Sequence, residues 1–112
     1  MNISSEGIGS LVVTFPIGTA KIGHVCKLGS MGTAHECASG DKFCGVLLAT
    51  ETGMAAVQVE GFVRVGYAGS KLSNGYVALT ADGTGKVVAN SNGREYLVVE
   101  VDTQTMTAII KL

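Results

Sequence analysis

A strict alternation of residue types between Val57 and Tyr67 constrains the fold of this chain more than any other feature. Successive side chains of an extended strand point to opposite faces, so a period of two predicts a half-buried β-strand, and no helical pattern fits. One face would carry Val57, Val59, Gly61, Val63, Val65 and Tyr67, and the other Gln58, Glu60, Phe62, Arg64 and Gly66. We therefore expect a sheet protein organised around this strand.

Turn signals divide the rest of the chain into short segments of the same kind. Ser73-Asn74-Gly75 and Asp82-Gly83-Thr84-Gly85 supply residues that tolerate positive φ, and Asn92-Gly93 is a strong hairpin signal. Further strands are predicted at residues 11–15, 24–28, 33–38, 43–50, 76–80, 86–89, 96–101 and 106–112. About nine or ten short strands at this spacing are typical of a β-sandwich or barrel, and no repeat of fixed period is evident.

The composition agrees with one all-β domain. The chain has 112 residues, enough for a single core, with 46% hydrophobic residues, sixteen glycines and one proline. Residues 1–10 offer little apolar surface to bury and are interpreted as a flexible N-terminal arm. Closure of the remaining strands removes unpaired edges, so residues 11–112 are predicted to form a small, filled, antiparallel β-barrel.

Several side-chain positions follow from these strands. Pro16 ends the first strand, which we expect at a sheet edge because proline cannot donate a ladder hydrogen bond. The segment 43–50 is predicted to be buried on both faces, with Gly45 allowing close approach of a neighbour. Tyr67 and Tyr76 are predicted in the core. In the strand 96–101, the residues expected to face inward are Leu97, Val99 and Val101, and those expected to face outward are Val98 and Glu100.

Charge and hydropathy exclude several classes of function. The formal net charge is -1, and the scattered lysines and arginines form no basic stripe for a nucleic acid. No apolar run approaches the roughly 20 residues that a membrane span requires, and the first ten residues lack the pattern of a signal peptide. We expect a protein made in the cytoplasm, with its three cysteines reduced.

Two short histidine and cysteine motifs raise the question of a metal site. His24-Val25-Cys26 and His35-Glu36-Cys37 each place an imidazole and a thiol on one face of a strand, with Cys44 nearby. A hairpin could bring both pairs to one tetrahedral ion. The alternative is that the cysteines are small buried hydrophobes and the histidines lie at strand ends, and the spacing matches no recognised zinc pattern. No metal or cofactor is therefore assigned.

No motif in the chain predicts catalysis. Gly83-Thr84-Gly85-Lys86 departs from a phosphate-binding loop, because Val87 stands where that motif requires serine or threonine and strands flank it on both sides. A β-turn explains it. Serine, histidine and acidic residues occur, but none lies in a nucleophile-elbow setting. The chain is not expected to be an enzyme.

The order of features from Phe43 to Leu112 resembles a family of small phage and prophage proteins, the capsid decoration or cement proteins of the lambda head decoration type. The matching segments are Gly40-Asp41-Lys42-Phe43-Cys44-Gly45-Val46, Ala56-Val57-Gln58-Val59-Glu60-Gly61-Phe62-Val63-Arg64-Val65, Gly69-Ser70-Lys71-Leu72-Ser73-Asn74-Gly75-Tyr76-Val77, Asp82-Gly83-Thr84-Gly85-Lys86-Val87, Val98-Val99-Glu100-Val101-Asp102 and Ile110-Lys111-Leu112. These are turn and strand signals, so they describe a scaffold.

The resemblance implies a structural protein of the virion that binds the outside of an assembled capsid, commonly as a trimer at three-fold positions. Its partner would be the major capsid protein, and the family has no catalytic residues to transfer. The arm could then add a strand to an exposed capsid edge. Residues assigned to partner binding are Ile3 and Ile8 in the arm and the outward Phe62 and Arg64.

Two other functions are compatible with a small glycine-rich β domain. A lipoyl-like carrier would need a modifiable lysine in a tight turn, and Lys71 is the approximate candidate, although it lacks the expected flanking residues. A metalloprotein would use His24, Cys26, His35, Cys37 and Cys44. A mass shift on Lys71 would favour the carrier, and bound zinc would favour the metalloprotein.

Overall fold

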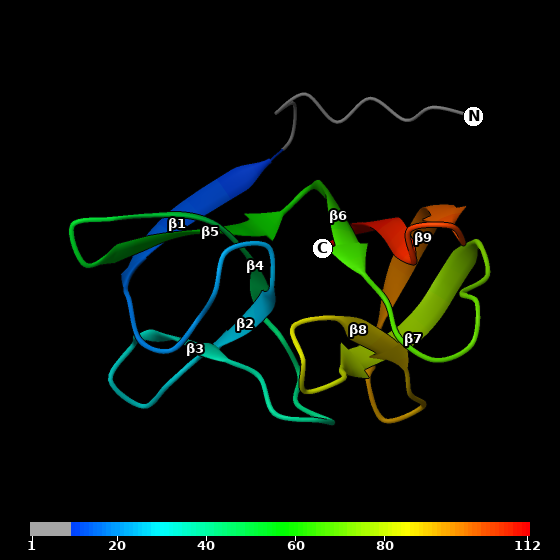
Figure 1. The fold of residues 1–112 in the computed structure, drawn as a ribbon, viewed down its shortest axis with the longest axis horizontal. Helices are drawn as coiled ribbons and strands as arrows, with labels where there is room; N and C mark the ends of the chain where they lie inside the picture. Colours follow the sequence, from blue (N-terminus) through cyan, green and yellow to red (C-terminus); the bar gives the residue numbers. More distant parts are fainter. Residues whose placement is uncertain (1–9) are drawn as a thin grey trace.

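The computed structural model describes residues 10–112, and within them the chain forms ten β-strands and no helix (Figure 1). The strands are β1 (Leu11–Pro16), β2 (Val25–Leu28), β3 (Ala34–Glu36), β4 (Gly45–Glu51), β5 (Met54–Glu60), β6 (Phe62–Gly66), β7 (Gly75–Ala81), β8 (Val87–Ala89), β9 (Arg94–Asp102) and β10 (Thr107–Lys111). The predicted all-β class is confirmed. Residues 1–9, which include most of the predicted arm, lie outside the described residues.

The strands of the described chain divide between two five-stranded antiparallel sheets. The first sheet has the order β1-β5-β4-β2-β3, and the second has the order β6-β10-β9-β7-β8. The first sheet occupies the left half of Figure 1 and the second the right half. Closure into one barrel is therefore not confirmed.

The alternating segment from Val57 to Tyr67 was predicted to form one strand. This prediction is wrong in one respect. Gly61, with φ of 91°, breaks it into β5 and β6, which belong to different sheets. Gln58, predicted to face outward, is only 6% exposed, and its amide donates hydrogen bonds of 3.0 Å to the carbonyls of Glu60 and Phe62. The glycine allows the turn, and the glutamine amide satisfies carbonyls on both sides of it.

The two sheets repeat one strand order. In each, the first strand lies at one edge beside the last, the fourth is central, and the second and third form a hairpin at the other edge. A single parallel bridge also recurs in each half, between Ile17 and Ala34 in the first and between Tyr67 and Val87 in the second. The chain therefore contains the same architecture twice, although no sequence repeat is visible.

One hydrophobic core joins both halves. Val25, Phe43 and Val46 from the first half pack in a cluster with buried residues of the second sheet, including Tyr96. The Phe43 and Tyr96 rings stack with centroids 4.9 Å apart and an interplanar angle of 12°. A smaller cluster formed by Cys26, Ala34, Leu47, Ala55 and Val57 lies within the first half. The sheets are thus held together by the larger core.

Backbone hydrogen bonds also cross between the halves. Ala81, at the end of β7, accepts from the Gly40 amide and donates to the Asp41 carbonyl, both at 2.9 Å. The Val25 amide at the start of β2 donates to the Gly85 carbonyl at 3.1 Å. These bonds place the β7–β8 turn against the β2 side of the first sheet.

The structure confirms several local predictions. The first strand lies at a sheet edge, as Pro16 indicated, and β2 and β3 form the expected hairpin. Gly45 is also confirmed as a point of close approach, because a Cβ atom there would overlap the Gln58 carbonyl oxygen on β5. In β4, however, only the first three residues are buried, so burial along the whole strand was wrong.

Two side-chain orientations were also wrong. Val98, expected to face outward, is only 1% exposed, whereas Val101 packs against the core as predicted, because an irregularity in the β9–β10 ladder places Val99 between the paired residues Val98 and Glu100. Tyr67 is buried as predicted, but Tyr76 is 73% exposed.

Among the described residues there is no helix with the length and hydrophobicity needed to cross a membrane.

Candidate functional site

The first strand, β1, offers an open sheet edge. On one side it pairs with β5 from Leu11 to Pro16, and no strand of the described chain pairs with its other side over these residues. Leu11 and Val12 are 49% and 47% exposed, whereas Phe15 packs against the smaller core cluster. An open edge with exposed apolar side chains is a template for a strand from another molecule.

Other edges of the described sheets are partly covered by the chain itself. Ala34 on β3 accepts hydrogen bonds from the Gly18 and Ala20 amides, and the Glu36 amide donates to the Thr19 hydroxyl. On β8, the Val87 carbonyl accepts from the amide of Ala68. The edge of β1 is therefore the more accessible edge of the first sheet.

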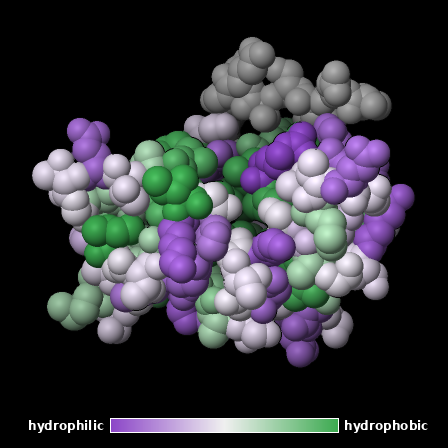
Figure 2. All heavy atoms as spheres, viewed as in Figure 1, coloured by the Kyte–Doolittle hydropathy of each residue, from purple (hydrophilic) through white to green (hydrophobic). Residues whose placement is uncertain are grey.

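Exposed hydrophobic side chains are concentrated on the same half of the molecule. Figure 2 shows hydrophobic residues grouped over part of the first sheet, to the left of the centre, and more hydrophilic residues over the second. Large exposed hydrophobic residues of the first half are Leu11, Val12, Ile22, Leu28, Met31, Leu48 and Met54, and those of the second half are Tyr76 and Met106. The first half, which carries the open edge of β1, therefore also has more of the large exposed hydrophobic side chains.

The four residues assigned to partner binding have different surroundings. Ile3 and Ile8 lie outside the described residues. Phe62 begins β6, is half-buried, and pairs with Lys111. Arg64 is exposed, donates a 3.0 Å hydrogen bond to the Thr107 hydroxyl, and lies 3.7 Å from a carboxylate oxygen of Glu100.

Phe62 and the start of β1 are close to the same crossover. Leu11 pairs with Glu60, which precedes Gly61, and Phe62 follows it directly. The open edge and Phe62 therefore lie on either side of the Gly61 crossover. Sequence reasoning named Phe62 but missed Leu11 and Val12, although Pro16 had indicated that their strand lies at an edge.

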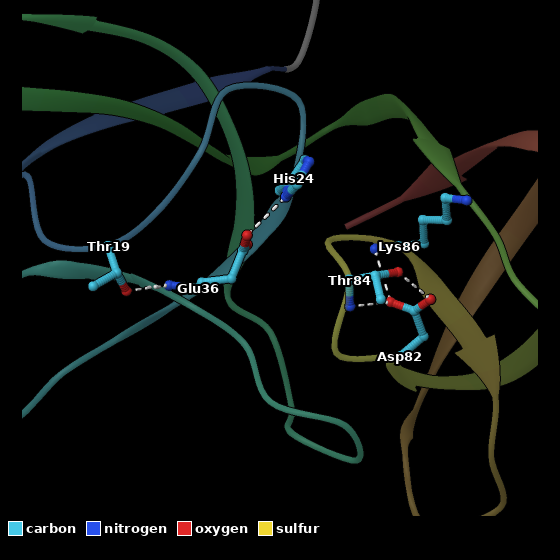
Figure 3. Close-up of polar contacts among 6 residues, drawn as sticks. All are labelled: Thr19, His24, Glu36, Asp82, Thr84 and Lys86. Atoms are coloured by element: carbon cyan, nitrogen blue, oxygen red, sulfur yellow. Dashed lines mark hydrogen bonds and ion pairs between the residues drawn. The ribbon is translucent and has the colours of Figure 1, made fainter.

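The structure does not bring the histidine and cysteine motifs together as one metal site. His24 Nδ1 lies 2.8 Å from Glu36 Oε2, whereas the ring of His35 contacts the Thr33 and Thr19 hydroxyls at 2.6 and 3.2 Å (Figure 3 shows the His24 pair). Within residues 10–112, no three histidine, cysteine or acidic side chains are placed to hold a metal ion.

His24 instead lies at the junction of the two halves. Its ring contacts the backbone of Gly85, whose φ is 96°, so closely that a Cβ atom at that position would overlap the imidazole. Glu36, on β3, holds the ring through the same Nδ1 atom that lies nearest to Gly85, and the second oxygen of Glu36 is buried without a partner. The contact fixes the β7–β8 turn against the first sheet.

The predicted turn at residues 82–86 is confirmed. Asp82 accepts hydrogen bonds from the Thr84 amide at 2.7 Å, the Thr84 hydroxyl at 2.6 Å and the Lys86 amide at 3.1 Å (Figure 3). Burial alone would raise the pKa of Asp82, but the bonds from Thr84 and Lys86 outweigh it and lower that pKa. The carboxylate closes the turn, so it leaves no cradle for a phosphate.

Lys71, the carrier candidate, lies in the long connection between β6 and β7. With Asn74, Val99, Glu100 and Val101 it lines a half-open cavity of about 310 Å³. A modifiable carrier lysine requires a tight turn between two paired strands, which this connection is not. The geometry does not favour the carrier function.

No protein-family model, no curated protein and no solved structure matches this chain. Its function is therefore inferred from its own residues and geometry.

Proposed function

We propose that this protein is a structural protein that binds the exterior of an assembled phage capsid and stabilises the shell. The support for the capsid is the resemblance of residues 43–112 to the decoration proteins. In this proposal the protein is made in the bacterial cytoplasm, resides on the virion surface and binds the major capsid protein as a homotrimer. Its role is mechanical, so it requires no catalytic residue or cofactor.

The observation that carries the proposal is the open edge of β1. A strand of a capsid subunit can pair with this edge through backbone hydrogen bonds, while apolar contacts to Leu11 and Val12 add to the affinity. Phe62 extends the surface beyond the crossover. Residues 1–9 directly precede β1, so an arm that adds a strand to the capsid would continue the same contact.

Trimer formation would raise the overall affinity for the capsid, even if each subunit binds it weakly. Linking three attachment surfaces makes the second and third binding events intramolecular, which raises the overall affinity well above that of one edge strand. A closed three-fold oligomer matches the symmetry of a three-fold capsid position. Native mass spectrometry of the tag-free protein should therefore show a trimer without metal, and a zinc-bound monomer would instead favour the metalloprotein.

The predicted barrel remains part of the proposal in a modified form. In each sheet the bridge between Ile17 and Ala34, or between Tyr67 and Val87, connects the chain after the first strand to the third strand. We propose that each sheet curls as a barrel-like unit around its own side of the core. The bridge involves Ile17, beyond the end of β1, so residues 11–16 keep an open side for a partner.

Co-sedimentation with assembled empty shells of the major capsid protein tests the attachment surface. Val12→Lys places a charge on the open edge, where lysine discourages strand pairing, and should reduce shell binding at least about tenfold. Deletion of Met1 to Gly9 should abolish binding. The matched control is Tyr76→Lys, which adds the same charge at an exposed position of the second sheet.

Circular dichroism would verify that every variant keeps the wild-type fold. Equal binding by wild type, the deletion and Val12→Lys would contradict the attachment surface. Failure of the wild-type protein to sediment with its shells would contradict the capsid function itself.

A further inference from the structure

Two of the three cysteines are adjacent across paired strands. Cys26 lies on β2, where it pairs with Gly45, and Cys44 directly precedes Gly45 in the chain. The Cys44 amide donates to the Cys26 carbonyl at 2.8 Å, and the Cys26 sulfur lies 3.7 Å from the Gly45 carbonyl oxygen. Both thiols are free.

The geometry of this pair suits a disulfide. A disulfide requires Cα atoms roughly 4.4–6.8 Å apart, a range expected for residues on neighbouring strands that share a direct backbone hydrogen bond. Gly45 itself is pressed against the Gln58 carbonyl of β5, on the side of β4 that faces away from β2, where no side chain would fit. The pairing of β2 with β4 holds the backbones of Cys26 and Cys44 next to each other.

The two thiols differ in accessibility and in acidity. Cys44 is exposed and Cys26 is fully buried. Interaction with the neighbouring Cys26 thiol lowers the pKa of Cys44 to about 7, and the same interaction, together with burial, raises the pKa of Cys26. Burial raises the pKa of the third thiol, Cys37, to about 11. Near neutral pH the reactive thiolate is therefore on the exposed residue of the pair.

We propose that Cys44 and Cys26 form a dithiol site for small-molecule disulfides, with Cys44 as the attacking thiol and Cys26 as the resolving thiol. This site is independent of the proposed capsid attachment and uses none of its residues. The exposed Cys44 sulfur reacts with the external disulfide, and the buried Cys26 sulfur completes the exchange.

The exchange has two steps. The Cys44 thiolate attacks one sulfur of the external disulfide, whose S–S bond breaks and releases one thiolate. The Cys26 sulfur then attacks the Cys44 sulfur of the mixed disulfide, and the second thiolate leaves with the proton from Cys26. Two protein thiols are oxidised to one disulfide, and the external disulfide is reduced to two thiols.

The product would cross-link β2 to the chain that enters β4. Because Cys26 belongs to the smaller core cluster, the new bond would join that core to the exposed segment at Cys44. Oxidation should therefore protect the amides of β2 and β4 from hydrogen exchange without unfolding either sheet.

The test uses the full-length reduced protein and glutathione disulfide at pH 7, followed by intact mass and peptide mapping. We expect a product lighter by two hydrogens, with Cys26 joined to Cys44 and Cys37 free. A stable glutathione adduct on the wild-type protein, a bridge that includes Cys37, or no reaction would overturn the proposal.

Variants separate the two roles. Cys26→Ala should accumulate the glutathione adduct on Cys44, Cys44→Ala should not react, and the control Cys37→Ala should behave as wild type. Cys26 is buried, so its variant could fail to fold, and wild-type alkylation by iodoacetamide provides a second measurement. Cys44 should be modified at least about a hundredfold faster than Cys37, with a midpoint near pH 7. A midpoint above pH 8 would contradict the attacking role.

Discussion

At the scale of single residues, the contact between Gly85 and His24 shows why a glycine is required at the junction. Gly85 has φ of 96°, a conformation that residues with a Cβ atom rarely adopt, and its open side is filled by the imidazole. Any side chain at this position would have to displace a ring that Glu36 holds in place.

Gly85→Ala should lower the free energy of unfolding by about 2–4 kcal/mol, since it combines backbone strain with overlap. Gly75→Ala is the matched control, because Gly75 has φ of 103° but nothing within 4 Å of the added Cβ. It should cost about 1–2 kcal/mol. Urea unfolding measures both, and equal losses would show that the His24 contact contributes nothing.

The residue scale also shows where sequence reasoning about the candidate site reached its limit. Pro16 predicted the edge strand because its missing N–H is a local property. The separation of His24 from His35 was not predictable, since it depends on Thr19, Thr33 and Glu36 as competing partners. The proximity of Cys26 to Cys44 likewise depends on which strands pair, a non-local property.

At the scale of elements, the crossover from β5 to β6 determines the division into two sheets. Alternation predicted extended chain on both sides of Gly61 correctly, but it contains no information on a change of sheet. The buried Gln58 amide compensates for the break by donating to the Glu60 and Phe62 carbonyls. Gln58 was interpreted as exposed because it is polar and alternates with apolar residues, although its amide in fact donates hydrogen bonds within a buried turn.

Gln58→Leu should destabilise the protein by about 1–3 kcal/mol, because it keeps a similar volume but leaves two carbonyl groups without their donor. Gln104→Leu makes the same chemical change in the exposed turn between β9 and β10 and should be nearly neutral. Thermal and urea unfolding would compare the variants. A neutral Gln58→Leu would mean that water satisfies both carbonyls.

At the scale of the whole molecule, the two sheets should behave as one cooperative unit. Phe43 and Val25 of the first half are buried among residues of the second, and the stack of Phe43 on Tyr96 crosses between them. Backbone hydrogen bonds at Ala81 add to this connection. Sequence length and composition predicted a single core, and the described residues form a larger cluster shared by both halves and a smaller one within the first half. The repeated strand order was invisible in the residues.

The distribution of side chains allows a direct test of this cooperativity. All three tyrosines lie in the second half and all three cysteines in the first. Tyrosine fluorescence and the reactivity of Cys26, which is buried in the smaller cluster of the first half, should therefore report separate sheets, and we expect their urea transitions to coincide. Two separated midpoints would show that the sheets unfold independently.

The repeated strand order also has an evolutionary consequence. Two copies of one architecture in a single chain can diverge in their chemistry while each retains the same path for the backbone. Here one copy holds the thiols and most of the exposed apolar surface, and the other holds the tyrosines. Selection acting on one surface can therefore change it while the other copy preserves the shared core.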